Sequence, residues 1–189
     1  SYKNKKACYK FSLNLLESDI SILPSKLPMK PEDLYKYLDK LDVKYELFEH
    51  EPHSTVKQSK RNRKNMKGFH LKNLFLRDKR KQNFLIVIQE DREVDLKGLP
   101  EKIGSSRVSF GSTDRLFEKL GVLPGSVTPL SIINNQEKDV HLFLDDRIKY
   151  ENKIFCHPLI NDRTISLSYL GLKKFFDSLN VKVNFLNFS

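Results

Sequence analysis

The stretch Gly121-Val122-Leu123-Pro124-Gly125-Ser126-Val127-Thr128-Pro129 places two glycines and two prolines between a helical pattern and a strand pattern. Before it, Ser112 is a good helix N-cap, and apolar residues recur at helical spacing over 116–120 until Gly121, a typical helix stop. After it, the apolar run 130–133 predicts a buried strand. Because glycine lacks a side chain and proline fixes φ, backbone N–H and C=O groups here can approach a ligand closely. The stretch therefore predicts either an ordinary turn or a small polar pocket.

Outward from this stretch, helical and strand patterns intermix along the chain. We expect helices at 31–41, 95–102, 112–120 and from Ser166 or Ser168 to Leu179, and strands at 45–48, 68–76, 84–88, 107–110, 130–133, 140–144, 154–157 and 181–185. Since hairpins require antiparallel pairs, the prediction is an α/β fold with a mixed, largely antiparallel sheet and helices packed around it. Residues 1–30, rich in lysine and interrupted by prolines, are predicted to be a basic N-terminal arm, and residues 31–189 to be one compact domain.

The composition indicates a soluble protein with a polyanionic partner. The 189 residues include 34 basic and 24 acidic side chains, a net charge of +10. Nucleic acid is favoured over a membrane surface, because the sequence contains neither a bilayer-spanning apolar run nor a basic helix with a strong apolar face. Cys8 and Cys156 lie far apart, which indicates neither a disulfide framework nor a zinc site. With no secretory signal pattern at the N-terminus, we expect a cytoplasmic location.

A basic segment lies between residues 55 and 67. It has no interleaved acidic residue and hardly an apolar one, and its basic side chains are Lys57, Lys60, Arg61, Arg63, Lys64 and Lys67. Most charge runs are solvated surface, but the absence of acids also fits contact with nucleic-acid phosphates. Both interpretations remain open from the sequence.

The strand predicted at 68–76 carries an unexpected polar pair. Period-2 alternation places Leu74 and Leu76 on one face and Asn73 and Phe75 on the other. Lys72 and Asn73 interrupt an otherwise apolar strand, so they either bind a ligand or mark where the strand emerges into water.

Metal and cysteine chemistry are disfavoured by the same local rules. We find no cluster of His, Cys and carboxylate residues with zinc spacing, so no metal or other cofactor is expected. Cys156 and His157 suggest a nucleophile and base, but adjacent residues of a strand point to opposite faces. The sequence therefore gives little support to a cysteine hydrolase.

Three stretches together resemble one family: residues 68–76, residues 121–129, and Phe155-Cys156-His157-Pro158-Leu159. Their order and spacing are similar to those of the YbaK-like aminoacyl-tRNA deacylases, the bacterial prolyl-tRNA synthetase insertion-domain family. Within it, the chain resembles the branch that hydrolyses alanine mischarged on proline tRNA. The resemblance covers residues 31–188, and such domains also occur fused to the N-terminus of some eukaryotic prolyl-tRNA synthetases. It implies the YbaK-like fold, with the acceptor end of tRNA(Pro), and where fused the rest of the synthetase, as partners.

The resemblance also implies roles for individual residues. Lys72 matches the functionally essential lysine of the family and is the expected catalytic residue. The expected substrate-binding residues in the matched stretches are His70, Asn73, Gly125, Ser126, Val127, Thr128, Pro129 and His157. Because an attacked ester develops negative charge, we favour Lys72 as an anchor for the oxyanion or terminal phosphate over a general base.

Two features leave alternatives open. Relatives commonly have a threonine-rich stretch after the His-Pro motif, where this chain keeps Thr164 alone, so its pocket size is expected to differ. The alternatives to an alanyl-tRNA(Pro) deacylase are a noncatalytic tRNA-binding appendage of a synthetase and a deacylase for cysteinyl-tRNA(Pro).

Overall fold

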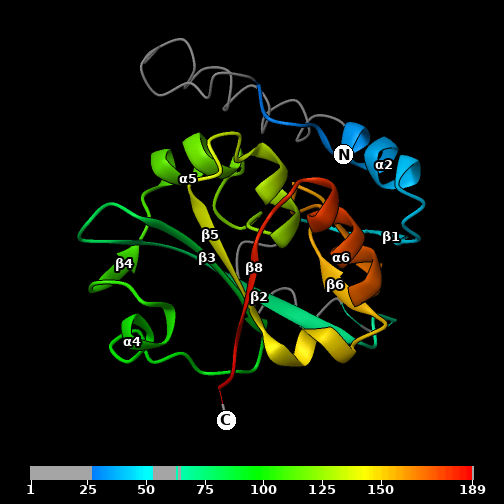
Figure 1. Cartoon of the computed structure of the whole chain (residues 1–189). Coiled ribbons are helices and arrows are strands. Elements are labelled where there is room, and N and C mark those ends of the chain that lie inside the picture. The colour runs from blue at the N-terminus through cyan, green and yellow to red at the C-terminus, as the bar shows by residue number, and fades with distance from the viewer. Residues whose placement is uncertain (1–26, 53–62, 64, 189) are drawn as a thin grey trace.

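Our computed structural model describes residues 27–52, 63 and 65–188 of the chain (Figure 1). The strands are β1 (Glu46–Glu49), β2 (Phe69–Asp78), β3 (Asn83–Gln89), β4 (Val108–Phe110), β5 (Val140–Asp145), β6 (Ile154–Cys156), β7 (Arg163–Leu167) and β8 (Val183–Leu186). The helices are α2 (Pro31–Lys40), α4 (Leu99–Ile103), α5 (Thr113–Leu120) and α6 (Tyr169–Ser178), with 3₁₀ helices η2 (Pro129–Asn134) and η3 (Asp146–Tyr150). The elements thus intermix along the chain as predicted.

All eight strands belong to one sheet in the order β1-β7-β6-β2-β3-β5-β8, with β4 paired to β2 outside this path. In the described residues, β1–β7, β2–β3, β2–β4 and β6–β7 are antiparallel, and β2–β6, β3–β5 and β5–β8 are parallel. The predicted α/β fold with a mixed sheet is therefore confirmed.

Strand β2 joins the two halves of this sheet. One of its edges pairs with β3 along residues 71–77, whereas the other edge pairs with β6 at 69–70 and with β4 at 76–78. Between β6 and β4, residues 71–75 have no strand partner on that edge within the described residues. The sheet consequently forks beside Asn73.

Each face of the sheet carries its own hydrophobic core. Leu85 and Val87 of β3 face the core covered by α2, α5 and α6, and Ile86 and Ile88 face the core covered by α4. All four side chains are fully buried. The alternation predicted for β2 is confirmed as well, because Phe75 belongs to the first core and Leu76 to the second.

Helix α5 ends where the sequence predicted. Ser112 accepts a hydrogen bond from the Arg115 N–H at 3.1 Å, and Gly121 closes the helix in the left-handed region at φ +63°.

The turn after α5 is also packed against residues before α2, because a Cβ at Gly121 would lie 2.5 Å from Pro28 Cβ. Met29 adds a bond from its N–H to Asn134 Oδ1 at 2.9 Å. The division between an arm and a domain at residue 30 stays a prediction.

The strand predicted at 130–133 is wrong, because these residues form η2. Thr128 caps this 3₁₀ helix by accepting from the Leu130 N–H, and the Ser131 hydroxyl donates to the Thr128 carbonyl at 2.6 Å. Pro129 has no N–H and sets a helical φ, which suits the first position of a helix. These local bonds outweigh the strand pattern of an apolar run.

Three further predictions need correction. Strand β7 was not predicted, because Arg163, Thr164 and Ser166 make the segment look polar although the whole strand is buried. Ser166 therefore lies in this strand, and Ser168 is the N-cap of α6, accepting from the Gly171 N–H. Helix α4 begins later than predicted, at Leu99, because the side chain of Asp95 accepts from the N–H groups of the turn before it.

Candidate active site

A cavity of about 40 Å³ opens beside the fork of the sheet. Its walls come from the start of β2, from β6 and β7, and from the segment after β1. His70, Asn73 and His157, three residues predicted to bind substrate, line it together with Arg63 and Cys156. The structure therefore brings together residues from two of the three stretches that carried the sequence resemblance.

Asn73 contributes a buried acceptor to this region. Its Oδ1 atom is buried and accepts no hydrogen bond from the described residues. Leaving such an acceptor unsatisfied costs about 1–3 kcal/mol. A polar group seated beside Asn73 would recover part of that cost.

The bonding partners of the histidines define their tautomers. His157 Nδ1 lies 2.8 Å from the Arg163 carbonyl, and His70 Nε2 lies 2.8 Å from the Met66 carbonyl. A carbonyl oxygen only accepts, so each of these two nitrogens carries a proton, and in a neutral ring the other nitrogen is the acceptor. Burial lowers the pKa of His70, whose ring stacks on Phe155 at a centroid distance of 4.5 Å, and therefore favours the neutral ring.

The loop Gly125–Pro129 reaches the cavity wall through Thr128. The Thr128 side chain is fully buried and is hydrogen-bonded to Cys156, which lines the cavity. Ser126 and Pro129 are also buried, whereas Gly125 is exposed at φ +87°, a left-handed conformation that favours glycine. The loop thus lies behind the wall at Cys156.

Burial raises the pKa of the Cys156 thiol to about 12. The nucleophilic form of a cysteine is the thiolate, so this side chain stays protonated and unreactive near neutral pH. Cys156 acts here as a wall of the cavity.

Lys72 lies on the opposite face of β2 from Asn73, as the alternation of a strand requires. Its Nζ donates to the Arg92 carbonyl, and Lys72 is not among the residues that line the cavity. It shares a face with His70, which is two positions away, or about 6–7 Å along the strand. An ammonium group has three N–H donors, so two are without a partner in the described residues.

Arg63 and Glu90 form an ion pair at the rim of the cavity. Arg63 donates twice to the Glu90 carboxylate, at 2.6 and 2.9 Å, and the Glu90 side chain is 6% exposed. The Glu90 N–H donates to the His70 carbonyl, which connects the pair to β2. Sequence reasoning missed Glu90, because an acid after a buried strand resembles an ordinary turn residue.

The other residues of the basic segment are less informative. Lys67 is exposed, and Lys57, Lys60, Arg61 and Lys64 lie outside the described residues. A contact between this segment and tRNA stays a prediction.

Two features are absent from the part of the chain that the structure describes. Across residues 27–52, 63 and 65–188, no group of three or more His, Cys, Asp or Glu side chains is arranged to hold a metal ion. In the same part of the chain, no helix combines the length and apolar character needed to cross a membrane.

Comparison with known proteins shows the family. The profile of the aminoacyl-tRNA editing domain matches residues 50–175. The prolyl-tRNA editing protein ProX of Acetoanaerobium sticklandii is 37% identical over 138 residues, which cover 72% of this chain and 84% of that protein. The prolyl-tRNA synthetase associated domain-containing protein 1 of Danio rerio is 30% identical over 148 residues, covering 77% and 80%.

A solved structure shows the same fold. It belongs to a protein named provisionally as a trans-editing enzyme for prolyl-tRNA synthetase, and it superposes with a TM-score of 0.60 at 15% identity, covering 85% of this chain and 98% of that one. Together with the profile match, which spans more than half of the sequence, these relatives place the chain in the aminoacyl-tRNA editing domain family.

Proposed function

We propose that this protein hydrolyses the ester of mischarged tRNA(Pro), with alanyl-tRNA(Pro) as its preferred substrate. The proposal rests on the observation that His70, Asn73 and His157 line the same small cavity. A water needs roughly 10–15 Å³ of such space, so a cavity of about 40 Å³ has room for a few heavy atoms. An alanyl group fits this space better than the larger prolyl ring, and the names of the relatives support tRNA(Pro) as the carrier.

The reaction is the addition of water to the ester carbonyl. The carbonyl oxygen becomes an oxyanion, the bond to the ribose oxygen then breaks, and a proton moves to that ribose oxygen. The products are the free amino acid and tRNA with an intact 3′ end. Cys156 takes no covalent part, because its raised pKa keeps the thiol protonated.

Each residue has a role that follows from its donors and acceptors. Asn73 and the His157 imidazole hold the aminoacyl group and the attacking water, and the loop Gly125–Pro129 supports the wall behind them through Thr128 and Cys156. Lys72 does not line the cavity, and it uses the two N–H groups that do not meet Arg92 to hold the phosphate of the terminal nucleotide. Anchoring the nucleotide in this way positions the ester for attack.

The test is to incubate the protein with tRNA(Pro) charged separately with alanine, cysteine and proline and to follow each ester. We expect the alanyl ester to disappear fastest and the prolyl ester to persist. Preferred loss of the cysteinyl ester would reassign the substrate. Survival of all three esters, with tRNA still bound, would replace the enzyme with a noncatalytic tRNA-binding domain.

The same assay tests for a metal requirement. The proposed chemistry needs positioned hydrogen-bond donors and water, so treatment with a chelator is expected to leave the rate unchanged. A rate that falls on chelation and recovers with added zinc would contradict this mechanism.

A further inference from the structure

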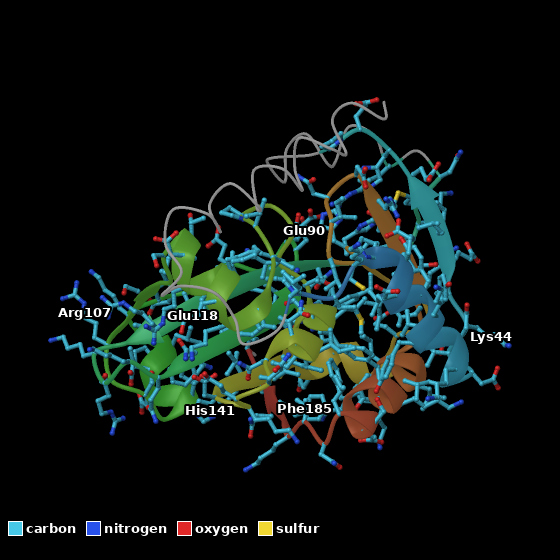
Figure 2. The ribbon with its side chains drawn as sticks, turned by 90° about the horizontal axis from the view of Figure 1, so that it is seen from above. Lys44, Glu90, Arg107, Glu118, His141 and Phe185 are labelled. Carbon is cyan, nitrogen blue, oxygen red and sulfur yellow. The ribbon has the colours of Figure 1, made fainter. Side chains whose placement is uncertain are left out.

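A second, larger cavity of about 180 Å³ lies where the parallel strands β5 and β8 begin. Lys138, His141, Asn180 and Lys182 surround its opening, and Ile132, Val140 and Val181 contribute apolar walls. The two cavities share no lining residue, and in Figure 2 His141 lies at the lower edge of the molecule, well apart from Glu90 beside the candidate active site. The proposed deacylation therefore does not use this cavity.

Hydrogen bonds hold the framework of this cavity in place. Asn135, which is 7% exposed, accepts from the Val140 N–H at 3.0 Å and donates to Asp139 at 2.9 Å. Asn184 donates to the Leu142 carbonyl at 3.1 Å and so spans β5 and β8. The walls are thus built by the sheet and by the turn that precedes it.

The charge of the cavity is positive and unpaired. Within the described residues, the side chains of Lys138 and Lys182 form no ion pair or hydrogen bond, and no carboxylate lies among the residues that line the cavity. The nearby acids are already engaged, because Lys119 pairs with Glu137 at 2.5 Å and with Asp139 at 2.7 Å. The two free ammonium groups therefore leave a local excess of positive charge.

We propose that this cavity binds a phosphate group. A phosphate presents several strong acceptor oxygens, and two ammonium groups, the Asn180 amide and the His141 ring supply matching donors. Such a group is either a phosphodiester of an RNA backbone or the phosphate of a small molecule, and both present the same charged oxygens to the lysines.

The first test is a calorimetric titration of the full chain with inorganic phosphate at low ionic strength. We expect saturable binding, weakened about tenfold in the double variant Lys138→Gln/Lys182→Gln, because each charge-assisted bond that is removed contributes a few-fold. The matched control is Lys36→Gln/Lys97→Gln, which removes the same charge from exposed lysines outside the cavity. Absence of saturable binding, or equal weakening in both double variants, would overturn the proposal.

An independent measurement uses the unmodified protein. Amide NMR shifts of Asn180, Lys182 and neighbouring residues should move with added phosphate, whereas those of Lys36 and Lys97, exposed lysines outside the cavity, should stay constant. Shifts confined to the candidate active site would contradict the proposed location. Because neither readout involves deacylation, this proposal and the proposed function can fail separately.

A final arm distinguishes the two sources of phosphate. If the cavity takes a backbone phosphodiester, the Lys138→Gln/Lys182→Gln variant should reduce the salt slope of tRNA binding by roughly 0.7–0.9. If it takes a small molecule, inorganic phosphate still binds and the tRNA slope is unchanged.

Discussion

Lys72 and Asn73 are neighbours in sequence, and the geometry of β2 gives them different surroundings. Asn73 faces the cavity with a buried acceptor, while Lys72 lies on the other face and donates to the Arg92 carbonyl. A lysine that donates to one neutral carbonyl keeps two of its three N–H donors for a ligand. Such a side chain is suited to holding an anion, whereas taking a proton from water requires a neutral amine.

The role of Lys72 makes a direct kinetic prediction. Lys72→Ala should lower single-turnover deacylation of alanyl-tRNA by roughly 100-fold or more, because an ester whose terminal nucleotide is no longer anchored is misplaced for attack. Lys72→Arg should recover little of this rate, because a planar guanidinium does not reproduce a compact ammonium. Lys79→Ala, at an exposed lysine of the β2–β3 turn, is the matched control and should react normally.

Stability must be measured on the same variants. Loss of the bond to Arg92 is expected to cost about 1 kcal/mol of unfolding free energy, so Lys72→Ala should still fold. A near-normal rate in this folded variant would remove Lys72 from the mechanism.

His70 makes a prediction about pH. Burial holds its folded-state pKa below the ordinary value of 6.5, so the unfolded chain binds the proton more tightly. The contribution of His70 to stability is therefore complete above pH 6.5 and is lost as the pH falls toward the depressed folded-state pKa. Urea denaturation at several pH values should show a steeper loss in the wild type than in His70→Phe, which keeps an aromatic ring against Phe155. Identical pH profiles would show that His70 does not titrate as described.

At the scale of elements, two glycines that follow helices distinguish the cost of a strained backbone from the cost of a crowded neighbour. They are Gly121 after α5 and Gly104 after α4. Gly121 and Gly104 both have left-handed φ angles, +63° and +68°, but a Cβ at Gly121 would meet Pro28 at 2.5 Å, whereas a Cβ at Gly104 would meet nothing within 4 Å. Gly104→Ala should cost about 1 kcal/mol of unfolding free energy from backbone strain. Gly121→Ala should cost about 1–3 kcal/mol more, because the crowded neighbours must move. Equal losses in urea denaturation would mean that residues 28 and 134 shift freely.

The sequence-based predictions succeeded where the signal came from residues that are neighbours in the sequence. The Ser112 cap, the Gly121 stop and the alternation in β2 depend on neighbouring residues, and the structure confirms them. Strand β7 was missed because it is buried between β6 and β1, and β1 is distant from it in sequence. An apolar run gives the same pattern in a strand and in a buried helix, which explains the error at η2.

The same distinction applies to the candidate site. The sequence singled out Asn73 and His157 through their motifs, but it could not predict that His50 meets Thr164 at 2.7 Å or that Arg63 meets Glu90. These pairs join residues far apart in the chain, and no spacing rule connects them. The motifs thus indicated the chemistry, and the fold supplied its surroundings.

At the scale of the whole molecule, the net charge of +10 is distributed unequally between paired and unpaired cations. Arg63 of the basic segment is matched by Glu90, while Lys138 and Lys182 have no such partner in the described residues. A paired cation releases fewer counterions on binding nucleic acid than a free one, so net charge alone overestimates the tRNA-binding surface.

The last prediction concerns the basic segment and separates tRNA contact from structural pairing. Replacing Lys57, Lys60, Arg61, Lys64 and Lys67 together with glutamine should weaken tRNA binding at low salt and lower its salt slope by roughly 0.7–0.9 for each phosphate that the protein no longer neutralises. An unchanged salt slope in this fivefold variant would show that the segment is solvated surface.

Arg63→Met should instead lower the free energy of unfolding by about 3 kcal/mol, because it leaves the buried Glu90 carboxylate unpaired. Glu90→Met combined with Arg63→Met should restore most of that stability, since neither charge then remains buried alone. An Arg63→Met protein as stable as the wild type would show that the ion pair contributes little to the fold.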